Sequence, residues 1–88
     1  MPYIKTNDRD RLDYVTDAIS NVGIKSAGEL NYLITRLCIA YTEDNPIGYQ
    51  SINDIVGALE SAKAEFYRRY AVSYEEKKIK ENGDVYHV

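Results

Sequence analysis

The chain has 88 residues, of which 44% are hydrophobic and 28% charged, and its formal net charge is −3. These values are typical of one soluble globular domain and argue against a chain that is disordered along its length. The single cysteine excludes an internal disulfide framework and a multi-cysteine zinc site. No apolar run reaches the roughly 18–20 residues of a membrane helix, and no signal-peptide core is present. We therefore expect a reduced, cytoplasmic protein of one domain, residues 1–88, with no membrane partner.

The first predicted helix covers residues 7–20 and follows a short extended arm. Thr6 or Asn7 can cap this helix, because a side-chain oxygen there accepts a hydrogen bond from the free N–H groups of the first turn. Apolar residues then recur at spacings of three and four, namely Leu12, Val15 and Ile19. A polar segment that contains Gly23 ends the helix near residue 20.

The second predicted helix, residues 26–42, carries the clearest pattern in the sequence. Ser26 and Glu29 have the spacing of a capping box, in which each side chain bonds to the backbone near the other residue. Six apolar residues then fall on one helical face: Leu30, Leu33, Ile34, Leu37, Cys38 and Tyr41. The turn-forming segment 43–48, with one Pro and one Gly, ends the helix.

The third predicted helix, residues 51–80, is the longest and contains no proline. Ser51 and Asp54 repeat the capping spacing at its start, and residues 82–83 supply a glycine cap at its end. Its apolar stripe consists of Ile52, Ile55, Val56, Leu59, Ala62, Phe66, Tyr70 and Tyr74. A short alternating tail follows. The predicted fold is therefore all-α, with three helices, a long C-terminal helix and short extended arms at both ends.

The length of the third helix has a consequence for assembly. About 28 residues at 1.5 Å each span roughly 42 Å, whereas a compact chain of this size has a radius of gyration of only about 12 Å. The two shorter helices cannot cover this length, so a monomer would expose the aromatic residues of its second half: Phe66, Tyr67, Tyr70 and Tyr74. We therefore expect a helical homo-oligomer. The alternatives are a kink at residues 71–73 or cover by the terminal arms.

Catalytic and metal sites are poorly supported by the sequence. The one histidine, His87, lies next to the C-terminal residue and has no His or Cys partner at ligand spacing. Cys38 lies on the apolar stripe of the second helix, where a thiol behaves as a small buried hydrophobe. No glycine-rich phosphate loop is present. We therefore predict that the protein is not an enzyme and has no catalytic residue, no cofactor and no metal.

Positive charge is concentrated in the third helix. Residues 63–80 hold six Lys and Arg against three Asp and Glu, whereas the rest of the chain holds five against eleven. Within this segment Glu65 and Arg69 have the spacing of an i,i+4 ion pair. The lysines near the end of the helix also have a structural explanation, because they offset the helix dipole. The arginines lie mid-helix beside aromatic residues, so for them a structural role and a ligand that carries phosphate are both open.

Guanidinium groups pair with phosphates and tyrosine rings stack on bases, so residues of these types are the candidates for ligand binding. The candidates are the cations Lys25, Arg36, Arg68 and Arg69, the rings Tyr3, Tyr70 and Tyr86, and the amide of Asn31. An alternative is open for three of them. Lys25 can belong to an ordinary helix start, and Asn31 and Arg36 can lie on a solvated helix face.

Four sets of motifs extend over nearly the whole chain. They are MPYIK and DRDRL (1–5, 8–12), GELNY and ITRL (28–32, 34–37), GALESAK and EFYRR (57–63, 65–69), and NGDVY (82–86). As a set they resemble a family of small proteins from tailed phages and bacteria that carries an unknown-function label. The resemblance implies a phage-type origin, and therefore the host cytoplasm as the location, but no particular activity.

The chain is also similar in kind to small, helical, oligomeric phage proteins that sequester cyclic-nucleotide or cyclic ADP-ribose signals of bacterial antiviral defence. The similarity lies in size, helicity, tyrosine content and the placement of arginine, and no motif matches, so no binding residue is carried over. It implies a non-enzymatic protein that binds such a signal in an inter-subunit pocket and counters host defence. Two alternatives stay open. One is an interaction protein that inhibits a host protein through the long aromatic helix, and the other is a small nucleic-acid-binding regulator, which the net negative charge disfavours.

Overall fold

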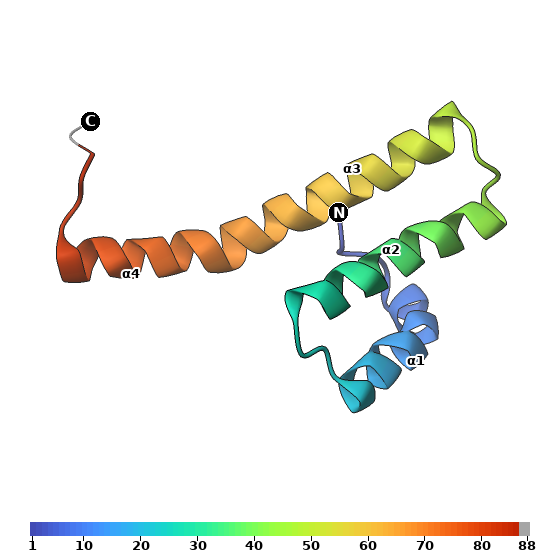
Figure 1. The fold of residues 1–88 in the computed structure, drawn as a ribbon, viewed down its shortest axis with the longest axis horizontal. Coiled ribbons are helices and arrows are strands. Elements are labelled where there is room, and N and C mark those ends of the chain that lie inside the picture. Colours follow the sequence, from blue (N-terminus) through green and yellow to red (C-terminus); the bar gives the residue numbers. More distant parts are fainter. Residues whose placement is uncertain (87–88) are drawn as a thin grey trace. The chain divides into compact units, whose positions relative to one another are not determined.

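The computed structural model describes residues 1–86, and all regular structure in this range is helical (Figure 1). In chain order the elements are α1 (Thr6–Val22), α2 (Ala27–Asp44), α3 (Tyr49–Phe66), the π-helical turn η1 (Tyr67–Ala71) and α4 (Val72–Asn82). The last three follow one another without a break and form the long C-terminal helix. The prediction of an all-α fold with three helices is therefore confirmed.

The chain divides into two compact units, which are described separately. One unit is Pro2–Val56, which contains the N-terminal arm, α1, α2 and the first turns of α3. The other unit is the chain from Gly57 onward, together with Met1. The prediction of a single domain over residues 1–88 stays a prediction.

The start of α1 differs from the prediction. Its N-cap is Lys5, and no side chain makes a capping hydrogen bond there, so the predicted cap at Thr6 or Asn7 is wrong. The carbonyl of Lys5 already accepts hydrogen bonds from the backbone N–H groups of Asp8 and Arg9, at 3.1 and 3.0 Å, which places Thr6 inside the helix. The guanidinium Nε of Arg9 donates to the Ile4 carbonyl at 2.7 Å. This bond ties the arm to the first turn.

The end of α1 and the start of α2 follow from local chemistry. The helix continues to Val22 because Gly23, with φ 83°, is the residue that can leave the helical conformation at low cost, and its N–H bonds to the Ile19 carbonyl at 2.8 Å. The capping box of α2 is confirmed, since the N–H of Glu29 donates to Ser26 Oγ at 3.1 Å. The Glu29 carboxylate reaches one residue beyond the cap and accepts from the N–H of Lys25 at 2.9 Å.

The turn between α2 and α3 corrects a second capping prediction. The helix α3 begins at Tyr49, so Ser51 lies within its first turn and is not the cap. Ser51 Oγ instead closes the turn, because it accepts from the N–H of Gly48 at 3.0 Å and donates to the Pro46 carbonyl at 3.0 Å. Ser51 is 7% exposed, and it is the one buried residue in the described part of the chain.

Asp54, which the sequence assigned to the same capping box, joins α2 to the start of α3. Its Oδ2 accepts from the hydroxyl of Tyr41 at 2.9 Å, and its Oδ1 accepts from Gln50 Nε2 at 2.8 Å. The carboxylate raises the pKa of the Tyr41 hydroxyl, mainly through this hydrogen bond. Tyr41 therefore stays a protonated donor at neutral pH.

The predicted apolar faces are present but uncovered. Among residues 1–86 no hydrophobic side chain is buried, although Cys38 is half-buried. On the predicted face of α2, for example, Leu30 is 47% and Leu37 is 56% exposed. A soluble domain normally removes such side chains from water. A single copy of the chain therefore leaves its helices without the apolar burial that usually stabilises them.

Candidate functional site

The π turn η1 changes which residues of the long helix lie above one another. The N–H of Val72 bonds to the carbonyl of Tyr67, five residues back, where an α-helix would use four. Two α-helical turns take 7.2 residues, so one extra residue brings positions eight apart onto the same side. Tyr67 and Glu75 show the effect, because the Tyr67 hydroxyl donates to Glu75 Oε1 at 2.8 Å. This hydrogen bond also raises the pKa of the Tyr67 hydroxyl.

Three aromatic residues at spacings of four form what we call the aromatic ridge: Phe66, Tyr70 and Tyr74. The rings of Phe66 and Tyr70 are stacked, with centroids 4.7 Å apart and an angle of 23° between their planes. The three residues are 65%, 66% and 61% exposed, in chain order. The ammonium group of Lys78 lies 5.5 Å from the centre of the Tyr74 ring, in cation–π range.

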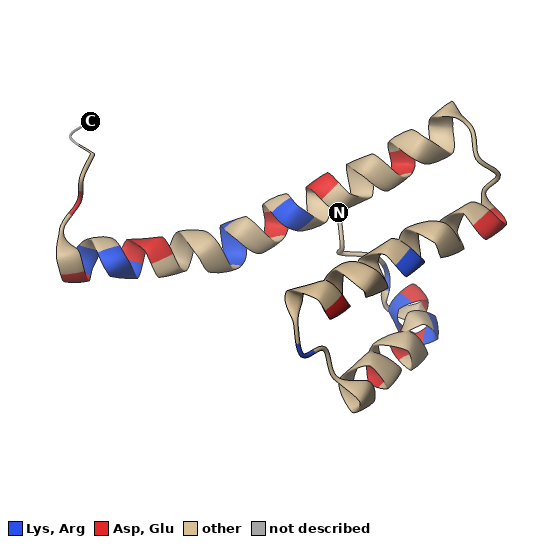
Figure 2. Ribbon diagram, viewed as in Figure 1, with Lys and Arg blue, Asp and Glu red and all other residues tan. Residues whose placement is uncertain are grey.

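Two arginines of η1 share one carboxylate at the N-terminal end of the turn. Glu65 Oε1 accepts from Arg68 Nη2 and, at 3.2 Å, from Arg69 Nε, so the predicted pair of Glu65 and Arg69 is confirmed. The arginine side chains are 61% and 58% exposed, whereas that of Glu65 is 25% exposed. Figure 2 shows basic and acidic residues interleaved along the long helix. Two guanidinium groups against one carboxylate leave this turn with an excess positive charge.

Arg68, Arg69 and Tyr70 are thus the candidates that the structure brings together, within one helical turn. π turns inside α-helices occur frequently at functional sites. The sequence pattern placed the two arginines beside the rings. It gave no sign of the π turn or of the contact between Tyr67 and Glu75, because the helical period of the apolar residues continues through this segment.

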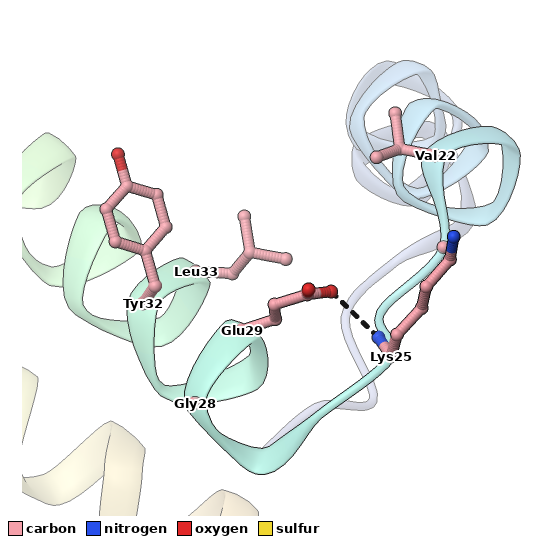
Figure 3. A pocket seen from close by; sticks show the side chains of 7 residues that line it. Val22, Lys25, Gly28, Glu29, Tyr32 and Leu33 are labelled. Carbon is pink, nitrogen blue, oxygen red and sulfur yellow. Dashed lines mark hydrogen bonds between the residues drawn. The ribbon is translucent and has the colours of Figure 1, made fainter.

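Lys25 lies at a cleft of the other unit. An open cleft of about 520 Å³ is formed where α1 ends and α2 begins, and it is lined by Val22, Gly23, Lys25, Gly28, Glu29, Tyr32 and Leu33. Figure 3 shows Tyr32 and Leu33 extending from α2 and Val22 lying across from them. Since Glu29 also lines the cleft, a phosphate bound here would meet a carboxylate. The contacts therefore favour the alternative of a helix start for Lys25.

The remaining candidates lie on the N-terminal arm, on α2 and after α4. Tyr3 lines a second cleft, of about 400 Å³, formed by the N-terminal arm and α1. Asn31 and Arg36 lie on α2 and line neither cleft, and the Asn31 carbonyl accepts from Thr35 Oγ1 at 2.8 Å. Tyr86 follows the end of α4, is 75% exposed, and its N–H donates to Asp84 Oδ1 at 2.9 Å.

Among residues 1–86, no three His, Cys, Asp or Glu side chains lie close enough to hold a metal ion together. His87, the one histidine of the sequence, lies outside the described residues. No helix in this range has the combination of length and apolar character needed to cross a bilayer.

Comparison with known proteins gives a family without an assigned activity. Searches of curated proteins and of solved structures find no match to this chain. A family model described as "Domain of unknown function (DUF6899)" matches residues 1–85. The resemblance to a family of unknown function over nearly the whole chain is therefore confirmed at that level, and the phage origin stays a prediction. Because the match covers almost the entire sequence, the chain belongs to the DUF6899 family.

Proposed function

We propose that this chain is a non-enzymatic binding protein that sequesters a nucleotide-derived signal of the cyclic-nucleotide or cyclic ADP-ribose type. In this proposal it acts as a homo-oligomer, in the cytoplasm of a phage host, and counters antiviral defence. The supporting observation is the π turn, where two exposed arginines belong to the same helical segment as a stacked, exposed aromatic pair. These are the groups that pair with phosphate and stack on a base.

The energetics of such a site are adequate for a small ligand. Stacking contributes about 1–3 kcal/mol per base, and a hydrogen bond to a charged group contributes about 1.5–3 kcal/mol. Two contacts of each kind give micromolar affinity or better after the cost of association. Arg68 and Arg69 supply the phosphate contacts and Tyr70 supplies a ring. The other candidates, Tyr3, Lys25, Asn31, Arg36 and Tyr86, stay predictions.

Glu65 sets the condition under which the arginines bind an anion. Its carboxylate already accepts hydrogen bonds from both guanidinium groups, so a phosphate competes with it or shares the arginines with it. All three side chains are partly exposed, so their mutual attraction is weakened by water and salt. A ligand that carries two or more negative charges therefore has the advantage over a singly charged one.

Calorimetric titration of the purified chain with a panel of cyclic nucleotides and cyclic ADP-ribose isomers tests the proposal. We expect saturable binding of at least one member. Arg69→Gln removes a charged donor and weakens binding about tenfold or more. Lys63→Gln is the matched control, because it removes one positive charge from the same helix outside the turn and leaves the affinity within about twofold. Wild-type protein that binds no member, or equal affinity of Arg69→Gln and wild type, contradicts the proposal.

A second candidate function is inhibition of a host protein that docks on the long helix. The observation in its favour is the aromatic ridge, which offers exposed rings without a polar pocket. Copurification from host lysate separates the two functions. A host protein recovered in stoichiometric amount supports the second candidate, whereas a recovered small ligand that absorbs ultraviolet light supports the first. The third alternative, a nucleic-acid-binding regulator, stays a prediction that no described contact favours.

A further inference from the structure

The aromatic ridge lies on a helix that has no second element within its own unit. From Gly57 to Tyr86 the described chain consists of one helix, which ends at Asn82, and a short tail. A single helix cannot bury its own apolar side, and helices in water gain most of their stability from the packing of that side. The ridge is therefore a surface that requires an occupant.

The area of the ridge and its neighbours is sufficient for an interface between two copies. An aromatic side chain buries about 150–250 Å². Phe66, Tyr70 and Tyr74 are each more than half exposed, so together they offer about 400 Å² per copy. Two copies that meet through the same face thus bury about 800 Å² from these rings, and a specific interface needs about 1,000 Å². Tyr67, which is 53% exposed, and Leu59, Val72 and Ile79, which are 38–43% exposed, lie on the same helix and are available to supply the remainder.

The charges beside the ridge have partners within the chain. Glu65 is bonded to Arg68 and Arg69, and Glu75 accepts from Tyr67. Lys78 pairs with Glu81 at 3.2 Å and lies over the Tyr74 ring. An occupant that covers the rings beside these groups therefore does not have to supply charge opposite to them. The surface consists of aromatic rings, some with a hydroxyl group at the edge, and a partner surface of the same composition fits it.

We propose that a second copy of this chain packs on the aromatic ridge, so that the two ridges face each other in a symmetric interface. The symmetry makes the surface its own complement, because each ring then meets an aromatic ridge of the same chemistry in an offset or edge-to-face arrangement. This inference rests on the homo-oligomer in the proposed function and assigns its contact surface. Tyr70 belongs both to the ridge and to the π turn, so the ligand site lies at the border of the same interface.

The experiment is sedimentation equilibrium combined with native mass spectrometry over a range of micromolar concentrations. Wild type is expected to contain at least two copies. Phe66→Gln and Tyr74→Gln each raise the dissociation constant about a hundredfold or more, because both copies lose a ring and Gln is a good helix former. Tyr74→Phe keeps the ring and the wild-type dissociation constant. Tyr14→Gln is the matched control, since this tyrosine lies on α1 and is 82% exposed.

Each outcome of this experiment either supports or overturns the inference. A monomeric wild type at all concentrations overturns it. So does an assembly whose dissociation constant does not change in Phe66→Gln and Tyr74→Gln, because the copies then meet through another surface. Titration of the same samples with the nucleotide panel separates this inference from the proposed function. An assembly that depends on the ridge but binds no nucleotide supports the interface and contradicts the proposed ligand. A monomer that binds a nucleotide supports the ligand and contradicts the interface.

Discussion

The hydroxyl of Tyr67 donates to Glu75 Oε1 at 2.8 Å, although eight residues separate them in the sequence. In a regular α-helix two turns take 7.2 residues, and a residue eight positions on would be displaced around the helix axis. The π turn η1 supplies the extra residue that aligns them. The side-chain contact and the backbone irregularity therefore depend on each other, and both lie where the candidate arginines are found.

Deletion of Ala71 tests this dependence. Removal of one residue from η1 leaves Tyr67 and Glu75 seven positions apart, close to the 7.2 residues of two α-helical turns, so a regular α-helix keeps them on the same side. Tyr74 likewise stays near the line of Phe66 and Tyr70. We expect circular dichroism to show as much helix as in wild type at concentrations where both are assembled, and sedimentation to show a dissociation constant close to that of wild type. A dissociation constant raised about tenfold or more in the deletion variant would contradict this account of how the π turn sets the register.

The hydrogen bonds of Tyr41 and Tyr67 to carboxylates predict a loss of stability at alkaline pH. The pKa of each hydroxyl is raised in the folded chain, by Asp54 and Glu75 respectively. A hydroxyl whose pKa is higher in the folded than in the unfolded chain adds to the free energy of unfolding. This contribution is fully present below the unfolded-state pKa of about 10, and it is lost as the pH rises through the folded-state pKa.

Urea unfolding of wild type and of the Tyr41→Phe/Tyr67→Phe double variant, at neutral pH and near pH 11, measures this effect. The variant lacks both ionisable hydroxyls, so its free energy of unfolding should fall less between the two pH values than that of wild type. Equal falls in the two proteins would argue against a contribution of these bonds to folding.

Glu65→Gln has the opposite predicted effect to Arg69→Gln. The substitution keeps the size and helix propensity of the residue but removes the negative charge that both arginines share. An anionic ligand then no longer competes with the Glu65 carboxylate, so its affinity should rise about two- to fivefold in calorimetric titration. The gain should shrink as salt is added, because the charges are exposed. A lower affinity in Glu65→Gln would mean that the carboxylate positions the arginines for the ligand.

Ser51 is predicted to be important for the stability of the turn between α2 and α3. Ser51→Ala leaves the N–H of Gly48 and the carbonyl of Pro46 without their side-chain partner in the one buried position of the described chain. These bonds are part-buried, so each contributes about 0.5–1.5 kcal/mol, and urea unfolding measures the loss. Thr16→Ala serves as the control. It removes a similar side-chain bond, from Thr16 Oγ1 to the Asp13 carbonyl at 3.1 Å, on an exposed helix surface.

The sequence predicted those features that depend on near neighbours in the chain. The three helices, the Ser26–Glu29 box and the glycine at the end of α4 follow from short-range spacing, and Gly83 adopts φ 90° as a helix-ending glycine can. The bond of Tyr41 to Asp54 joins residues thirteen apart, across a turn whose closure by Ser51 could not be read from a capping pattern. Among the candidates, Arg68, Arg69 and Tyr70 were predicted together because they are adjacent. Candidates that only a distant contact could unite, such as Tyr3 and Tyr86, stay predictions.

Native mass spectrometry of the chain purified from its producing cells tests the central claim most directly. The spectrum is recorded before and after addition of the panel of cyclic nucleotides and cyclic ADP-ribose isomers, and it reports the number of copies and any bound small mass together. The account predicts an assembly of two or more copies that gains the mass of a defined ligand, with the gain weakened in Arg69→Gln. A monomer that takes up no member of the panel would contradict both the binding function and the interface.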